Sequence, residues 1–317
     1  MSDTRSDLRL TVVGLTQEAE GVVSVLLGRD DGSPLPSWSA GAHIEVHLAP
    51  GLIRHYSLCG PADAAGLWRI AVLRSANSRG GSVYIHDQLG IGDAIDVVGP
   101  RNHFTMEAGA SQLFIAGGIG ITPILPMIAA AEAAGSDWRL LYGGRCRASM
   151  AFLKELECYR DRVTIAPQDE TGLLDLPAAV RAMPGDAHVY VCGPEPLINA
   201  AQQACAQLPP GRLRFERFTP VSTESAGPST GFEVELAQSA QTLYVAPEQS
   251  IVEVLEAAGI DIPTSCREGI CGTCEVAVLD GTPDHRDSVL DDAEKAANDC
   301  MMTCVGRALT PKLVLDL

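Results

Sequence analysis

Five cysteines in the C-terminal third of the chain have a spacing that could bind a metal cluster. Cys266, Cys271 and Cys274 follow the pattern C-x4-C-x2-C, and Cys300 and Cys304 come later, Cys304 after an interval of 29 residues. Four thiolates are the ligand set of a [2Fe–2S] cluster, and this spacing is typical of such clusters. A structural zinc site is the alternative, but zinc sites usually combine paired C-x2-C segments. The pattern therefore predicts a [2Fe–2S] cluster with Cys300 or Cys304 as the fourth ligand.

A second group of residues, near the N-terminus, could bind a phosphate and a flat ring. Arg54, Tyr56 and Ser57 lie in the segment RHYSL, and Gly80, Gly81 and Ser82 follow about 25 residues later. A guanidinium holds phosphate with two hydrogen bonds, a tyrosine offers a flat face, and a Gly-Gly-Ser turn exposes amides and a hydroxyl. Each fragment alone is compatible with ordinary structure. His55 points to the opposite face of its strand, where we expect it to pack.

Two further segments could bind a dinucleotide. The segment GGIGITP, with Gly117, Gly118, Gly120, Thr122 and Pro123, follows an apolar run and opens a helix, so a pyrophosphate could approach the helix N-terminus. It is not a G-x-G-x-x-G motif, because a proline stands where the last glycine would be. The segment VCGPEP, with Cys192, Gly193 and Pro194, ends a strand some 70 residues later. Open α/β sheets bind ligands at such strand ends.

Arg145 and Arg147 follow the next predicted strand, in a segment without an acidic residue. At this position an acid favours the ribose 2′-hydroxyl and an arginine accommodates a 2′-phosphate. The sequence thus favours acceptance of NADPH. Two arginines on a solvated loop are the alternative explanation.

The elements that must position these residues change character along the chain. Residues 8–104 consist of short β-branched runs separated by turns, which predicts an antiparallel barrel or sandwich. From residue 111, strands alternate with helices, which predicts a parallel sheet flanked by helices. The Ser/Pro/Gly-rich stretch 220–230 is typical of a linker. A hairpin, an amphipathic helix, the cysteine segment and a last strand complete residues 231–317.

Composition limits the class of protein and its partners. The chain has 317 residues, 46% of them hydrophobic, and a net charge of −17. Residues 231–317 contribute 16 acidic and 5 basic residues. This acidity argues against nucleic acid and against an anionic membrane as partners. No apolar run is long enough for a spanning helix and the first residues lack the apolar core of a signal peptide, so we expect a cytoplasmic protein. In a reducing cytosol we do not expect the ten cysteines to form a disulfide framework. We assign Cys59, Cys158 and Cys205 to packing and expect Cys146 to be exposed.

The order of the motifs resembles the phthalate dioxygenase reductase family, which includes vanillate demethylase reductases. RHYSL and the Gly-Gly-Ser turn resemble the flavin site of ferredoxin-reductase-like proteins, and GGIGITP and VCGPEP resemble their nucleotide signatures. The cysteine segment resembles a plant-type ferredoxin, whose closing pattern favours Cys304 over Cys300. The resemblance implies a flavin-binding β-barrel at residues 1–106, an α/β NAD(P)H domain at 107–219 and a β-grasp ferredoxin at 231–317.

The resemblance also implies cofactors, roles and a partner. FMN, rather than FAD, would be held by Arg54, Tyr56, Ser57, Gly81 and Ser82. Thr122 and Cys192 would lie beside the nicotinamide of NADH or NADPH, and Phe218 would stack near the flavin, although a core aromatic is nearly as compatible. The protein would be a monomeric reductase for a terminal oxygenase, either a Rieske-type enzyme or a cytochrome P450. A redox sensor without sustained turnover is the alternative from another class.

Overall fold

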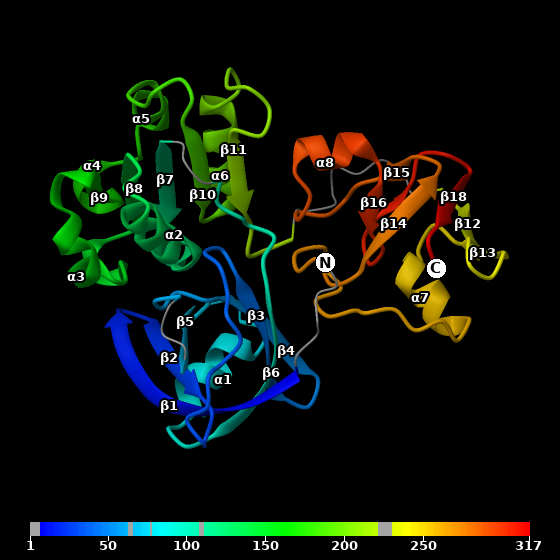
Figure 1. Ribbon diagram of the computed structural model, residues 1–317, viewed down its shortest axis with the longest axis horizontal. Coiled ribbons are helices and arrows are strands. Elements are labelled where there is room, and N and C mark those ends of the chain that lie inside the picture. The colour runs from blue at the N-terminus through cyan, green and yellow to red at the C-terminus, as the bar shows by residue number, and fades with distance from the viewer. Residues whose placement is uncertain (1–6, 63–65, 77, 108–110, 221–229) are drawn as a thin grey trace. The chain divides into compact units, whose positions relative to one another are not determined.

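The computed structural model describes residues 7–62, 66–76, 78–107, 111–220 and 230–317 (Figure 1). Contacts between residues divide the chain into two units, Met1–Glu216 and Arg217–Leu317. Most of the predicted linker, residues 221–229, lies outside the described residues. Among the described residues, none of the helices has the length and apolar character required to cross a bilayer.

The first part of unit 1 is an antiparallel sheet of six strands, in the order β4-β3-β6-β1-β2-β5. A bridge between Leu58 and Ile70, and a hydrogen bond of 2.8 Å from Cys59 N to Arg69 O, join the end of β4 to β5 and close the sheet. Helix α1 packs on this barrel through the buried Ile85. The elements are β1 (Asp7–Ala19), β2 (Val22–Gly28), β3 (His43–Ala49), β4 (Leu52–Ser57), β5 (Leu67–Leu73), α1 (Gly81–Asp87) and β6 (Ala94–Arg101).

The second part of unit 1 is a parallel sheet of five strands, in the order β11-β10-β7-β8-β9. Its central strand β7 is buried along its whole length, because helices cover both faces of a parallel sheet. The elements are β7 (Gln112–Gly117), α2 (Ile121–Ala133), β8 (Trp138–Gly144), α3 (Leu153–Leu156), β9 (Val163–Pro167), α4 (Gln168–Thr171), α5 (Leu176–Arg181), β10 (His188–Cys192), α6 (Glu195–Ala204) and β11 (Leu213–Glu216).

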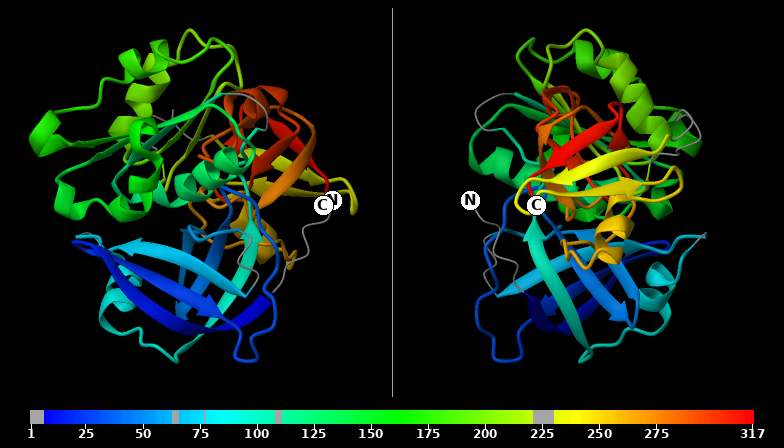
Figure 2. Two further views of the ribbon diagram at one scale, coloured as in Figure 1. Left: turned by 60° about the vertical axis from the view of Figure 1, so that its left-hand side comes forward. Right: turned by 90° about the vertical axis from the view of Figure 1, so that its right-hand side faces the viewer.

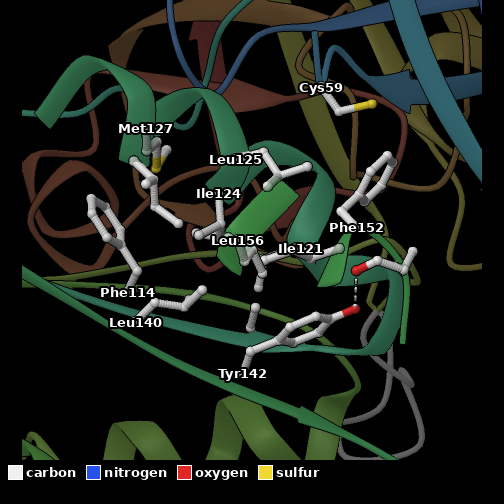
Figure 3. Close-up of a cluster of buried hydrophobic side chains, with 14 of the residues drawn as sticks. Cys59, Phe114, Ile121, Ile124, Leu125, Met127, Leu140, Tyr142, Phe152 and Leu156 are labelled. Carbon is white, nitrogen blue, oxygen red and sulfur yellow. Dashed lines mark hydrogen bonds between the residues drawn. The ribbon is translucent and has the colours of Figure 1, made fainter. Parts of the chain in front are cut away.

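Side chains that alternate along β7 build two separate cores. Leu113 and Ile115 pack with residues of α5 and α6, whereas Phe114 packs with residues of α2. The second of these cores also contains Cys59 from the barrel (Figure 3). The barrel residues Val22, Ala71 and Phe104 belong to the same core. The barrel and the parallel sheet therefore share one hydrophobic core, and α2, which lies in it, is apolar on most of its surface.

Unit 2 is a mixed sheet of five strands, in the order β13-β12-β18-β14-β16, with α7 packed on it through Ile251, Val252 and Leu255. Figure 2 shows the yellow hairpin of β12 and β13 beside the red β18. Ser250 begins α7 with a capping box, in which its side chain accepts from Glu253 N. The elements are β12 (Phe232–Leu236), β13 (Gln241–Val245), α7 (Ile251–Ala257), β14 (Glu275–Asp280), β15 (Pro283–Asp284), α8 (Asp292–Ala297), β16 (Cys300–Met302), β17 (Arg307–Ala308) and β18 (Lys312–Leu315).

The architecture confirms the predicted fold class: an antiparallel barrel, a parallel α/β sheet and a C-terminal α+β domain. One local prediction is wrong, because Cys158 is exposed rather than packed. Helix α3 ends at Leu156, and the 3-10 turns that follow it leave the Cys158 side chain exposed, with its Sγ 3.3 Å from Glu155 O. Cys59 and Cys205 are buried as expected, and Cys146 is half-buried.

Candidate functional site

The residues predicted to hold a flavin lie on β4 and at the start of α1. The Arg54 guanidinium donates to the carbonyls of Ile53, at 2.6 Å, and of Arg79. A Cβ on Gly81 would lie 2.6 Å from Arg54 Cγ, so any larger residue would displace the arginine side chain from this turn. Ser82 Oγ donates to Ser78 Oγ at 2.9 Å and accepts from Ser75 N at 3.1 Å. A guanidinium, a hydroxyl and a glycine turn are thereby brought together, a set that fits a phosphate group.

Tyr56 follows Arg54 on the same face of β4, and burial raises the pKa of its hydroxyl strongly. Its ring packs against the barrel core. His55, on the opposite face, has its ring centroid 5.6 Å from that of His43, in an edge-on contact that agrees with the expected packing role. The alternation of the strand thus separates the Arg54 and Tyr56 pair from His55.

The two glycine-containing segments of the nucleotide domain meet at the ends of adjacent strands. Strand β7 pairs with β10 up to Ala116 and Cys192, and Gly117 and Gly193 follow directly. A Cβ on Gly120 would lie 2.2 Å from Cys192 O, so the turn before α2 packs directly on the end of β10. This close approach places the backbone of both segments at one edge of the sheet, where open α/β sheets bind ligands.

Thr122 and Cys192 are both buried in this region. Thr122 Oγ1 donates to Ile119 O at 3.0 Å, which stabilises the turn into α2. The Cys192 side chain has no measurable exposure, and burial raises the pKa of its thiol well above the ordinary value. A thiol with this pKa stays protonated at neutral pH, so Cys192 is suited to packing against a ligand and not to nucleophilic attack.

A carboxyl group that the sequence analysis did not select lies beside Cys192. Glu216 ends β11 directly opposite Cys192, and Ser57 Oγ lies 3.4 Å from Glu216 Oε2. Burial raises the pKa of Glu216 to about 8, partly offset by the Ser57 hydrogen bond. The end of the predicted flavin segment therefore meets the end of the nucleotide sheet at a carboxyl that keeps its proton at neutral pH. No local motif marks Glu216, since it reaches this place only through the pairing of β10 with β11.

The predicted 2′-phosphate arginines are not equivalent in the structure. Arg147 forms two hydrogen bonds with Glu170, from Nε at 3.1 Å and from Nη2 at 2.8 Å, whereas Arg145 is exposed. The sequence shows no acid next to these arginines, but the fold places Glu170, from the segment after β9, beside Arg147. Because Arg147 is already paired with this carboxylate, Arg145 is the more accessible of the two cations for a phosphate.

The predicted cluster ligands form a connected group of thiols in unit 2. The side chain of Cys266 interacts with those of Cys271 and Cys304, and Cys304 also interacts with Cys274. Glu268 N donates to Cys266 Sγ at 3.3 Å, as expected of a loop that wraps an anionic group. The donor set of four soft sulfurs fits a [2Fe–2S] cluster.

Cys300, the rival fourth ligand, lies in different surroundings. It pairs with Ala277 in the β14–β16 ladder, and its pKa is raised to about 12 by burial and by the carboxylates of Glu275, Asp299 and Glu294. Cys304, in contrast, interacts with two of the other three cysteines, Cys266 and Cys274. This arrangement supports Cys304 as the fourth ligand.

Phe218 lies in unit 2, past the division between the units, and is 39% exposed. The alternative that it is a core aromatic is therefore wrong. Its predicted place near the flavin stays a prediction.

The fold and these motifs define a pyridine-nucleotide oxidoreductase with an iron–sulfur domain. Residues 114–203 match the model of the oxidoreductase NAD-binding domain, and residues 234–309 match that of the 2Fe-2S iron-sulfur cluster binding domain.

Comparison with known proteins places the chain more narrowly. It is 40% identical to the phenoxybenzoate dioxygenase subunit beta of Ectopseudomonas oleovorans, over 99% of this chain and 98% of that protein. The structure of phthalate dioxygenase reductase, described as transferring electrons from pyridine nucleotides to [2Fe–2S], matches with a TM-score of 0.71 and 37% identity over 98% of each chain. The chain belongs to this family of oxygenase reductases.

An intact type IV self-sufficient cytochrome P450 monooxygenase matches as well, with a TM-score of 0.92 and 43% identity. The match covers 98% of this chain but 41% of the P450 chain. The same fold thus occurs as part of a longer chain.

Proposed function

We propose that the protein passes electrons from NADH or NADPH to FMN, then to the [2Fe–2S] cluster, and from there to a Rieske-type terminal oxygenase. A flavin accepts two electrons as hydride and releases them one at a time, so it links a two-electron donor to a one-electron cluster. The observation that carries the proposal is the meeting of Ser57, from the predicted flavin segment, with Glu216 and Cys192 at the edge of the nucleotide sheet. Two cofactors that exchange hydride must meet at such a place.

The residues of the chain have separate tasks in this scheme. Arg54 and Ser82 would hold the phosphate of FMN, with Gly80 and Gly81 shaping the turn, and Tyr56 and Ser57 would contact the flavin. The glycines of GGIGITP, with Pro123, and the Gly193-Pro194 pair would hold the pyrophosphate of the dinucleotide. Thr122 and Cys192 would position the nicotinamide, Arg145 and Arg147 would contact the ribose or phosphate of the dinucleotide, and Phe218 would stack near the flavin.

Glu216 keeps a proton at the proposed hydride-transfer edge. A neutral carboxyl there avoids a buried negative charge, which would repel the electrons that reach the flavin. Ser57 holds the carboxyl in place through its hydroxyl. We assign Glu216 a role in controlling the charge and proton of this site.

The proposed domain organisation follows these tasks. Residues 1–106 bind FMN, residues 107–219 bind NAD(P)H, residues 220–230 connect, and residues 231–317 carry the cluster as a plant-type ferredoxin. We propose a monomer in the cytoplasm, with the acidic ferredoxin domain as the electron exit. A cytochrome P450 is the second candidate acceptor, favoured by the match to part of a self-sufficient P450 chain.

Separating the two halves of the electron path tests the proposal. A truncation ending at Thr219 should keep FMN, identified by mass, and should bleach with NAD(P)H and reduce ferricyanide. It should lose cytochrome c reduction and support of the oxygenase, which the full chain retains. Full-length protein assayed with a Rieske-type oxygenase and with a P450 distinguishes the acceptors. A truncation that supports the oxygenase as well as the full chain contradicts the proposed electron path, and recovery of FAD contradicts the cofactor.

A further inference from the structure

Unit 2 gathers its few positive charges at one cavity. Residues 231–317 contain only 5 basic residues against 16 acidic ones. A cavity of about 270 Å³ is lined by Cys304 and by three of these basic residues, Arg267, Arg286 and Arg307. Glu248 and Glu253 also line this cavity, so three of these five basic residues lie beside one predicted cluster ligand together with two carboxyl side chains.

The three arginines differ in how their charge is compensated. Arg267 pairs with Glu256 at 2.5 Å, and Arg286 pairs with Asp284 at 2.7 Å. Arg307 forms an ion pair with no carboxylate of the described residues. Asp284 lies opposite Arg307 in the β15–β17 pair, but its carboxylate bonds to Arg286. Arg307 is therefore the arginine of this cavity without a direct ion pair in the described chain, and the carboxylates of Asp284 and Glu248 only partly offset its burial, because its pKa is still lowered overall.

Arg307 is held by main-chain oxygens instead. Nη1 donates to Gln249 O at 2.6 Å, and Nη2 donates to Thr230 O and to Ala246 O, both at 3.0 Å. Its guanidinium carbon lies 5.1 Å from the centroid of the Phe232 ring, and Nε has no hydrogen-bond partner among the described residues. Carbonyl dipoles and a ring face solvate a cation, but they carry no net charge.

Burial makes this arrangement costly unless a negative charge lies nearby. Arg307 is 6% exposed, and an unpaired charge in such surroundings is strongly destabilising. Cys304 precedes it by three residues and lines the same cavity. A [2Fe–2S] group held by four thiolates is anionic, and its negative charge increases by one when it accepts an electron. The cluster would add the counter-charge that Asp284 and Glu248 supply only in part.

We propose that the buried guanidinium of Arg307 is the counter-charge of the [2Fe–2S] cluster and raises its reduction potential by stabilising the reduced form. This inference depends on the proposed function for the cluster and for Cys304 as its ligand. The electron comes from NAD(P)H through the flavin, and no bond is formed or broken at Arg307. Arg307 acts through the cluster as a positioning and charge-setting residue, and it favours the forward flow of electrons into unit 2.

A redox titration of the full-length holoprotein, followed by the EPR signal of the reduced cluster, tests this role. Arg307→Met removes the charge and the three carbonyl bonds, whereas Arg307→Lys keeps the charge and loses the bidentate geometry. Lys312→Met is the matched control, because it removes one positive charge of the same unit from an exposed pair with Glu235. At the wild-type midpoint, Arg307→Met should lower the ratio of reduced to oxidised cluster about tenfold, or ~59 mV for one electron. Arg307→Lys and the control should stay within about threefold of wild type.

The outcomes separate a charge effect from a structural one. Arg307→Met with full cluster content and an unchanged midpoint overturns the inference, although the proposed function would stand. If Arg307→Met does not retain its cluster, the result for Arg307→Lys is used instead. An Arg307→Lys variant with the wild-type midpoint and a lower melting temperature supports the inference. An Arg307→Lys variant with a lowered midpoint overturns it. A wild-type protein without a [2Fe–2S] signal overturns the proposed function and the inference together.

Discussion

Glu216 should make the folded protein less stable as the pH rises towards 8. Its pKa is raised from 4.5 to about 8 in the folded state, chiefly by burial. Above pH 4.5 the unfolded chain loses this proton, while the folded chain keeps it until the pH reaches about 8. The folded state therefore binds more protons in this window, and the free energy of unfolding falls as the pH rises.

The shift sets the size of the effect. At 1.36 kcal/mol for each pKa unit, the free energy of unfolding should fall by about 3–5 kcal/mol between pH 4.5 and pH 8. The upper value is a maximum, because Glu216 is only partly shielded from solvent. Glu216→Gln keeps the shape and cannot titrate, so it should lose this slope and match or exceed the wild type near pH 8. Ser57→Ala removes the hydrogen bond that lowers the pKa of Glu216, so the loss of stability should move to higher pH.

Urea unfolding of the full-length holoprotein at several pH values, followed through the flavin signal of unit 1, measures these slopes. The wild type and Glu216→Gln should diverge steadily between pH about 5 and pH about 8. A second measurement, the pH profile of flavin reduction by NAD(P)H in single turnover, should lose a step near pH 8 in Glu216→Gln. Parallel stability curves for the two proteins would refute the assignment of a raised pKa to this carboxyl.

Three other predictions concern cofactor binding. Substitution of a predicted ligand by Ser should abolish or strongly perturb the EPR signal of the reduced cluster; the ligands are Cys266, Cys271, Cys274 and Cys304. Cys300→Ser should preserve the signal. If Cys300→Ser destroys the signal and Cys304→Ser preserves it, the assignment of the fourth ligand is wrong. Arg54→Ala should weaken FMN binding ten- to a hundredfold, about 1.5–3 kcal/mol, in a fluorescence titration of the apoprotein, and unchanged affinity would contradict a phosphate contact. Gly120→Ala should lower the melting temperature and NAD(P)H affinity, because the new Cβ would lie 2.2 Å from Cys192 O, whereas Gly185→Ala, with open space around it, should change neither.

The sequence could predict those parts of the site that lie within short segments. The C-x4-C-x2-C segment from Cys266 to Cys274 and the segments GGIGITP and VCGPEP each occupy fewer than ten residues, so their chemistry can be recognised before the fold is known. The three domain types could also be predicted, because strand rhythm and strand–helix alternation are set by local hydrophobic patterns. Local patterns were less successful at helix ends, as Cys158 shows, since tertiary packing decides where a marginal helix stops.

The tertiary structure alone decided which distant groups share an environment. Ser57 and Glu216 are separated by 159 positions in the chain and meet because β10 pairs with β11 in a unit that also contains the barrel. Glu170 reaches Arg147 through the fold as well, and Arg307 donates to carbonyls of two separate segments, at Thr230 and at Ala246 and Gln249, that no motif connects. A side chain's type and spacing fix which chemistry it can perform, whereas its charge state and partners depend on burial and on long-range strand pairing, which the sequence does not display.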